Sequence, residues 1–246
     1  MRRRRAVVVF IVGTIVLVLF AGALPRMVEE SLPQTSGGAN SGIVGSDTSM
    51  PQTNSTEATQ PEPGSALTAL QAIEVKGRAA KTDYARDQFG DGWAKVSGCS
   101  TRDIILHRDL ADDMIDENCK VVSGVLNDPY TGESIQFTKT DSAKVQIDHV
   151  VALSDAWQKG AQQLTRAQRI QLANDPLELL AVSGAANQAK SDGDAATWLP
   201  KNKSFRCEYV ARQIAVKQKY TLWVTQAEKD AITQVLATCP LQPLPV

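Results

Sequence analysis

Apolar residues recur at helical spacing in the first segment that has the composition of a folded domain. Over 66–89 the apolar positions favour one helix, and Gly90-Asp91-Gly92 has the composition that ends it. Ser100 then precedes a shorter periodic run that reaches Leu110, and its hydroxyl suits the N-cap of a second helix. The pattern therefore predicts two helices before the first strands.

Strand-like patterns come next. Two short apolar runs, 121–126 and 134–138, enclose Asp128-Pro129-Tyr130-Thr131-Gly132, which has turn chemistry, so together they predict a β-hairpin. Residues 144–153 alternate at first and then become continuously apolar. That change predicts a strand that packs on a core and ends in a loop.

The second half of the domain alternates between helix and strand signals. Thr165-x-x-Gln168 is a capping box, and it predicts a short helix that ends near Asn174. Residues 177–182 form an apolar run of strand length, which Ser183-Gly184 ends before a further helix. Strand, excursion, strand and helix thus follow in that order.

Two helices of matched length end the chain, over 204–219 and 226–238, and Thr225-x-x-Glu228 is a capping box for the second. A short link joins them, which favours antiparallel packing. With the strands before them, these helices predict an α+β fold.

The first 65 residues differ in composition from the rest. Arginines at 2–5 precede an apolar run over 6–24, so residues 1–30 predict either a signal peptide or a membrane anchor. Residues 31–65 are rich in Ser, Thr, Gly, Pro, Gln and Asn and predict a disordered linker. Residues 66–246 predict one domain. We expect an exported protein, either secreted or anchored by residues 6–24 to the outer face of the cytoplasmic membrane.

Charge is nearly balanced over the whole chain, at −1, but residues 190–219 carry a local excess of +4. A local basic face suits a polyanion, and an ordinary solvated helix surface explains any single one of these side chains equally well. The cations of this segment are Lys190, Lys201, Lys203, Arg206, Arg212, Lys217 and Lys219.

Four cysteines in an exported chain indicate disulfides, and the absence of a C-x-x-C pair argues against a zinc knuckle. Three pairings are possible. Antiparallel packing of the last two helices brings Cys207 near Cys239, which leaves Cys99 with Cys119. We therefore predict the pairs Cys99–Cys119 and Cys207–Cys239.

The candidate chemistry lies at Asp148 and His149, late in the predicted strand, with Asn187 and Lys190 on the helix that follows the next strand. Neighbouring residues of a regular strand point to opposite faces, so a site that uses both Asp148 and His149 needs the strand to bend or end there. Carboxylate and amide oxygens favour Mg²⁺ or Mn²⁺ over Zn²⁺, and histidine can accept a proton at neutral pH.

This ββα order resembles the HNH endonucleases, and residues from about 99 to 239 resemble the exported bacterial proteins that carry the HNH domain named after the C-terminal part of GmrSD restriction endonucleases. Each matching stretch is weak alone, whereas the ordered set is specific. The stretches are Gly98-Cys99-Ser100-Thr101-Arg102, Asp128-Pro129-Tyr130-Thr131-Gly132, Ile147-Asp148-His149-Val150-Val151-Ala152-Leu153, Asn174-Asp175-Pro176-Leu177 and Asn187-Gln188-Ala189-Lys190-Ser191-Asp192.

The resemblance implies a ββα-metal (His-Me finger) core with an added N-terminal β-hairpin and flanking helices. It assigns His149 as the general base that deprotonates water, and Asp148 and Asn187 as ligands of one divalent ion that stabilises the departing 3′ oxygen. Lys190, one helical turn beyond Asn187, is expected to hold a phosphate or to offset charge in the transition state.

One position departs from the family pattern. The middle Asn of HNH normally lies nine residues before the last, where this chain has Glu178. Glu178 either replaces its hydrogen bonding in the loop that presents His149, or reaches the metal, or is a plain strand residue. Asn174 is the other candidate, and we expect it ahead of Glu178 as the organiser of that loop.

Other candidates have a structural explanation of at least equal weight. Arg102 could contact a phosphate or form a surface ion pair, and His107 is expected to be an exposed helix residue. Asp192 and Asp194 are expected to cap or solvate a helix end. The tryptophans are expected to pack in the core or half-buried rather than to serve as base-stacking platforms. They are Trp93, Trp157, Trp198 and Trp223.

The sequence thus predicts a monomeric, metal-dependent HNH endonuclease that hydrolyses phosphodiester bonds of DNA, with RNA as an open alternative. Its partner is nucleic acid, and it meets a membrane only through its N-terminal segment. The rival interpretation is a catalytically inactive exported nucleic-acid-binding or cell-surface protein on the same scaffold, because Glu178 could spoil the site. A metal-dependent phosphatase or peptidase is a further rival, although no H-E-x-x-H helix is present.

Overall fold

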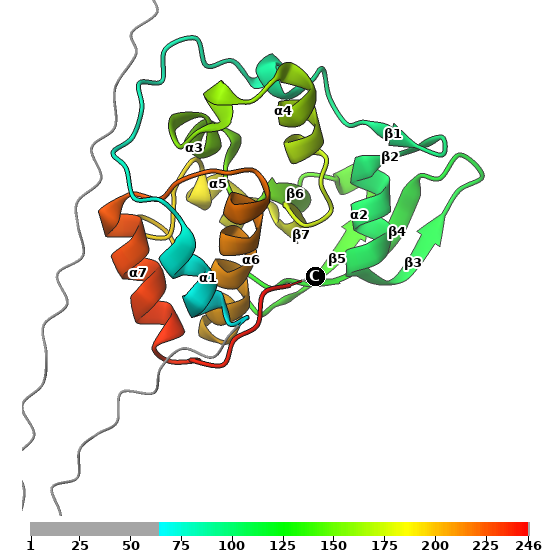
Figure 1. Cartoon of the computed structure of the whole chain (residues 1–246). Coiled ribbons are helices and arrows are strands. Elements are labelled where there is room, and N and C mark those ends of the chain that lie inside the picture. The colour runs from blue at the N-terminus through cyan, green and yellow to red at the C-terminus, as the bar shows by residue number, and fades with distance from the viewer. Residues whose placement is uncertain (1–63, 246) are drawn as a thin grey trace, which may run out of the picture. The chain divides into compact units, whose positions relative to one another are not determined.

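Helices and short antiparallel strands interleave along residues 64–245, the part of the chain that the computed structural model describes (Figure 1). The α+β class is confirmed. The signal or anchor expected at residues 1–30, and all but the last two residues of the expected linker, lie outside the described range. Within that range, none of the helices combines the length and apolar character needed to cross a bilayer.

The helices are α1 (Ala66–Ala72), α2 (Thr101–Asp109), α3 (Leu153–Gln158), α4 (Arg166–Ala173), α5 (Gly184–Lys190), α6 (Arg206–Lys219) and α7 (Gln226–Leu236). The strands are β1 (Lys95–Val96), β2 (Cys99–Ser100), β3 (Leu110–Ile115), β4 (Val121–Asn127), β5 (Ser134–Thr138), β6 (Val145–His149) and β7 (Leu179–Ser183). Short 3-10 turns are η1 (Arg86–Phe89), η2 (Lys139–Asp141), η3 (Ala161–Gln163) and η4 (Lys203–Phe205).

Strands β6 and β7 pair antiparallel and lead into α5, which is the ββα order expected from the sequence. The pairing runs from Val145 opposite Ser183 to His149 opposite Leu179. Strand β6 therefore ends at His149, four residues earlier than the predicted 144–153, and this early end satisfies the condition for a site that uses both Asp148 and His149.

The β6–β7 ribbon separates two apolar clusters because alternate residues of a strand point to opposite faces. Leu180 and Val182 join a cluster built mainly from α1, α3, α6 and α7. Leu179 and Ala181 join a second cluster with α2, β4 and β5. Burial on both faces explains why β7 reads as a continuous apolar run in the sequence.

Gly184 sets the approach of α5 to the start of β6. A Cβ at this position would lie 2.0 Å from the carbonyl oxygen of Ala143, so only glycine fits. The amide of Gly184 also donates to the carbonyl of Lys144 at 2.8 Å. This close contact brings the first turn of α5 beside β6 and its candidate residues.

The predicted hairpin is present as β4 and β5, but it belongs to a three-stranded sheet that the sequence did not reveal. Strand β3 adds to β4 where we expected only the end of a helix. Its side chains, LADDMI, are mostly exposed, so they show no strand alternation, and the pairing comes from β4.

The helix predicted over 66–89 is wrong beyond Ala72. The chain turns extended at Ile73 and pairs its backbone with distant segments: Val75 forms a parallel bridge with Val224, and the amide of Ala79 donates to the carbonyl of Gln158. These long-range hydrogen bonds outweigh local helical periodicity. The helix begins at Ser65, whose side chain accepts from the amide of Thr68.

Helices α6 and α7 confirm the last two predicted helices, and Figure 1 shows both beside α1 at one side of the fold. Cys207 and Cys239 are bridged across the α6–α7 pair, as predicted. The capping box at Thr165 is complete, whereas at Thr225 only the hydroxyl takes part, because the Glu228 carboxylate turns inward to Lys159 and Lys217.

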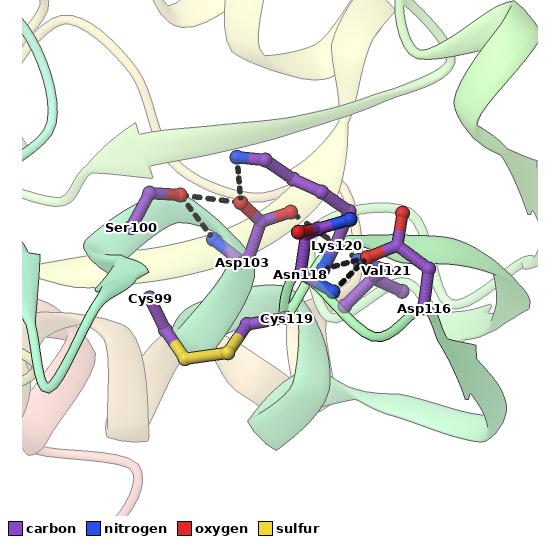
Figure 2. Close-up of a disulfide and its surroundings, with 8 residues drawn as sticks. All are labelled: Cys99, Ser100, Asp103, Asp116, Asn118, Cys119, Lys120 and Val121. Carbon is purple, nitrogen blue, oxygen red and sulfur yellow. Dashed lines mark hydrogen bonds and ion pairs between the residues drawn. A yellow bond between two sulfur atoms is a disulfide. The ribbon is translucent and has the colours of Figure 1, made fainter.

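The Cys99–Cys119 pairing is also as predicted, and it ties the start of α2 to the turn between β3 and β4 (Figure 2). Beside it, Ser100 caps α2 by accepting from the amide of Asp103. The Asp103 carboxylate receives the ammonium of Lys120 at 2.9 Å and the amide of Val121 at 3.3 Å. The disulfide and this carboxylate thus fasten α2 to the three-stranded sheet.

Candidate active site

Strand β6 ends between two pockets. One, here called the amide pocket, has a volume of about 340 Å³, and its wall includes Gln146, Asp148, His149, Asn187 and Gln188. The other, here called the aromatic pocket, has a volume of about 390 Å³, and its wall includes Phe89, Gly92, Trp93 and Ala173. Three side chains, those of Arg86, His149 and Leu153, line both pockets.

His149 is held as a neutral ring. It is 7% exposed, and its Nε2 lies 3.0 Å from the carbonyl oxygen of Ala173. A carbonyl only accepts, so Nε2 carries the hydrogen and Nδ1 keeps the lone pair. Burial lowers the pKa of His149 to about 3, against the opposing effect of the Ala173 carbonyl. At neutral pH the ring is therefore unprotonated and its Nδ1 lone pair is unoccupied, which is the starting state of a general base, and that role stays a prediction.

Trp93 packs against the His149 ring, and Asn174 supports the backbone next to Trp93. The indole of Trp93 stacks on His149 with ring centroids 5.7 Å apart and planes 4° from parallel. Asn174 accepts from the amide of Ala94 at 2.8 Å and donates to the carbonyl of Ile170 at 3.0 Å. Asn174 thus fixes the backbone next to Trp93, so the structure gives it a positioning contact to the residues around His149.

Asp148 is buried in a different setting. One carboxylate oxygen accepts from the ammonium of Lys190 at 2.9 Å, and the other accepts from the hydroxyl of Tyr130 at 2.5 Å. Burial raises the pKa of Asp148, and both Lys190 and Tyr130 oppose that rise. Lys190 is only 2% exposed and also donates to the backbone carbonyl of His149 at 2.8 Å. It therefore braces the Asp148-His149 pair, while its expected phosphate contact stays a prediction.

Asp148 and Asn187 share the wall of the amide pocket. The Asn187 amide nitrogen donates to Gln146 at 2.9 Å, so the amide oxygen takes no part in that bond. Its expected ligation of a cation stays a prediction. Residues 64–245 contain no group of three or more His, Cys, Asp or Glu side chains that could hold a metal. The donor set at this pocket, one carboxylate and one amide, fits a hydrated ion of the Mg²⁺ class, which keeps several waters.

Glu178 carries the hydrogen bonding that we expected first from Asn174. It is fully buried, its Oε2 accepts from the amide of Val151 at 3.1 Å, and its backbone carbonyl accepts from the amide of Val150 at 2.9 Å. Both bonds hold the segment directly after His149. The expected ranking of Asn174 ahead of Glu178 is therefore wrong for this segment, because Asn174 faces Ala94 instead.

Two arginines differ from expectation. Arg102 is half-buried and lies over the ring of Phe137 at 6.0 Å, with a 3.4 Å contact to the carbonyl of Val145, and it lines neither pocket. Burial lowers the pKa of Arg102. Arg86, which belongs to no motif of the sequence, is exposed and lines both pockets. A phosphate contact therefore suits Arg86 better than Arg102.

The basic face expected over 190–219 has fewer free cations than the charge count of this segment predicts. Lys217, like Lys190, is buried, and it pairs with Glu228 at 3.0 Å. Lys219 pairs with Asp175 at 2.6 Å. Asp194 is also buried, where it binds Lys159 rather than solvating a helix end. Arg212 also pairs with Glu208, at 3.9 Å. Four of the seven counted cations thus pair with carboxylates of this chain.

An acid, an imidazole and an amide therefore meet where a strand ends against a helix in a ββα unit. The family model described as GmrSD restriction endonucleases, C-terminal domain, matches residues 101–235, more than half of the chain. This chain belongs to that family. The GmrSD C-terminal domain is of the HNH nuclease type, whose members generally use a divalent metal.

A relative of this GmrSD C-terminal family member is a protein of Arthroderma benhamiae described as an uncharacterized secreted protein. It is 40% identical over 182 residues, which cover 73% of this chain and 87% of the relative. No solved structure matches the chain significantly.

Three residues at the site were missed as functional candidates. Tyr130 lies in a family-like stretch that we interpreted as a turn only, so a signal for it existed. Trp93 was expected to pack in or near the core, and Arg86 falls in the segment wrongly predicted as helix. Nothing local in the sequence connects either one with His149, because both reach it through the tertiary fold.

Proposed function

We propose that this chain is an exported, metal-dependent endonuclease that hydrolyses phosphodiester bonds of DNA, with RNA as the second substrate class. The observation that carries the proposal is the state of His149. Its Nε2 is held by the carbonyl of Ala173, its Nδ1 keeps the lone pair, and its ring shares a pocket with Asp148 and Asn187. Membership in an HNH-type family supports the reaction class.

In this proposal His149 takes a proton from water at Nδ1, and the water oxygen attacks the phosphorus. Asp148 and Asn187 would hold one Mg²⁺ or Mn²⁺ ion, which when bound supplies Lewis-acid stabilisation of the departing oxygen. Lys190 and Tyr130 keep the Asp148 carboxylate in place. Glu178 holds the amide of Val151, so the substitution of the middle Asn preserves a support of the loop and favours an active site over an inactive scaffold.

Export is part of the same proposal. Four arginines followed by the apolar run 6–24 have the composition of a signal or anchor, and the Arthroderma relative is described as secreted. Two disulfides among residues 64–245 suit an oxidising compartment.

Plasmid nicking by the full chain tests the activity. We expect cleavage with Mg²⁺ or Mn²⁺, none with EDTA, and strongly reduced cleavage with His149→Ala or Asn187→Ala. His107→Ala is the matched control, because this second histidine is exposed on α2, with 62% of its side chain accessible. Cleavage that survives EDTA, or that keeps its wild-type rate without His149, would contradict the proposal, and DNA binding without metal-dependent cleavage would support the non-catalytic alternative.

A further inference from the structure

The aromatic pocket has no part in the proposed hydrolysis, yet it shares the His149 wall with the amide pocket. Phe89, Trp93 and His149 give it three aromatic side chains, and Leu153 and Ala173 add apolar surface. Its volume of about 390 Å³ is in the range of pockets that take a small ligand. A flat, uncharged group is therefore the ligand that its chemistry favours.

Charge separates the two pockets. Arg86 lines both, and its guanidinium has no hydrogen-bond or ion-pair partner among residues 64–245. On the aromatic side, the exposed carboxylates of Asp87 and Asp91 also line the pocket and disfavour a phosphate there. On the amide side, the Asp148 carboxylate is neutralised by Lys190 at 2.9 Å. A phosphate is thus attracted to Arg86 and the amide pocket, and a neutral ring to the aromatic pocket.

The aromatic pocket is preformed. Asn174 holds the backbone beside Trp93, and the parallel stack on His149 sets the indole orientation. Gly92, at the rim, has a φ of +129°, and a Cβ added there would meet nothing within 4 Å. Glycine therefore permits the rim conformation, and no side chain from this position fills the opening.

We propose that the aromatic pocket binds the base of a nucleotide next to the scissile phosphate, and that Arg86 contacts the backbone phosphate between the two pockets. This inference rests on the proposed function. Every base has a face that stacks on an aromatic side chain, so the site tolerates different bases. A base inside a duplex must first leave its stack, which costs a few kcal/mol. The inferred substrate class is therefore single-stranded or locally unpaired nucleic acid.

Binding of a short strand tests the inference without relying on turnover. The full chain is titrated in Ca²⁺ with a labelled trithymidylate and with an otherwise identical strand of abasic sites. We expect the abasic strand to bind about tenfold or more weakly, since one base–aromatic stack is worth ~1–3 kcal/mol. Trp93→Ala should bind the trithymidylate as weakly as the abasic strand, and Trp93→Phe, which keeps an aromatic face, should recover most of the affinity.

Arg86→Ala separates the phosphate contact from the base contact. It should weaken the binding of both strands by the same factor. It should also reduce the magnitude of the negative slope of log affinity against log salt by about one. Lys229→Ala, which removes one cation from α7 outside both pockets, should change neither quantity.

Several outcomes would overturn the base pocket: equal affinity for the two strands, no measurable binding of either, or a Trp93→Ala variant that still prefers the base-bearing strand. Failure of the proposed hydrolysis gives a different result. Base-dependent and Trp93-dependent binding, with no cleavage of single strands in Mg²⁺ or Mn²⁺, would keep the pocket and reject the nuclease.

Discussion

Asp148 and His149 are neighbours in sequence, but the fold gives them opposite surroundings. Asp148 is fixed by an ammonium at 2.9 Å and a phenol at 2.5 Å, both buried. The His149 ring has one hydrogen bond, to a backbone carbonyl, and an indole stacked on it. An ion pair and a charge-assisted hydrogen bond thus fix the carboxylate, whereas one neutral hydrogen bond and ring packing fix the imidazole.

The difference teaches how one strand end can supply two kinds of group. A metal-binding carboxylate must stay ionised and fixed, and a neighbouring cation favours both, here against the effect of burial. A general base must stay neutral, and burial without a carboxylate partner keeps the ring unprotonated. We therefore expect changes around His149 to affect activity more than stability, and changes around Asp148 to affect both.

His149→Ala should have the largest effect, on activity. Loss of a general base typically costs 10²–10⁴-fold, so we expect cleavage to fall about 10³-fold, equivalent to about 4 kcal/mol. The free energy of unfolding should change by less than about 2 kcal/mol, because the ring makes a single hydrogen bond. Single-turnover cleavage and urea unfolding measure the two quantities. A stability loss as large as the activity loss would contradict the contrast drawn between the two residues.

Lys190→Met should have its main effect on stability. Removing the ammonium leaves the Asp148 carboxylate buried without its cation, and breaking a buried pair costs about 3–5 kcal/mol. Urea unfolding measures the loss. Lys203→Met, at an exposed position of η4, is the matched control and should stay within about 0.5 kcal/mol of the wild type. Equal stability of the two variants would show that the Asp148–Lys190 pair does not hold the site.

Tyr130→Phe removes the second partner of Asp148 and keeps the ring. A hydrogen bond to a charged group contributes about 1.5–3 kcal/mol, so we expect a loss of about 2 kcal/mol in the free energy of unfolding. Tyr209→Phe removes an equally buried hydroxyl whose bond, from Gln213 at 3.0 Å, is between neutral groups. That control should cost only about 1 kcal/mol. A larger loss of unfolding free energy for Tyr209→Phe than for Tyr130→Phe would contradict the assignment of the charge-assisted hydrogen bond to Tyr130.

The parts of this fold that the sequence predicted are those with local causes. Ser100 and Thr165 cap the helices that they were expected to cap. The β6–β7–α5 order followed from apolar runs and a Ser-Gly break. The disulfides were predictable because two helices of matched length with a short link pack antiparallel, which places Cys207 by Cys239 and leaves the other two cysteines as a pair.

The parts that the sequence did not predict depend on distant contacts. Residues 73–85 have helical periodicity, but their backbone pairs with Val224 and Gln158, far along the chain. Lys190 meets Asp148 across 42 residues, which no local pattern encodes. Burial of Lys217 was hidden for the same reason, so composition overstated the basic face.

Glu178 is a fully buried carboxyl that, unlike Asp148, forms no ion pair with any of residues 64–245. Its Oε2 accepts from Val151, and its Oε1 has no hydrogen-bond partner among the described residues. Burial raises its pKa well above the ordinary value of 4.5. The folded protein therefore keeps this group protonated at pH values where the unfolded chain has released the proton.

Stability should consequently fall as pH rises from 4.5 toward the folded-state pKa of Glu178, by up to about 1.4 kcal/mol per pH unit, because the unfolded chain then binds fewer protons. Glu178→Gln keeps an oxygen for the amide of Val151 and removes the titration, so its unfolding free energy should lose this part of the pH dependence and exceed that of the wild type at pH 8. Urea unfolding from pH 5 to 8 measures the difference. Glu117→Gln, at an exposed position, should follow the wild-type profile. If Glu178→Gln also follows the wild-type profile of stability against pH, the Glu178 carboxyl is ionised in the folded protein. A cation must then lie close to it, as one does to Asp148.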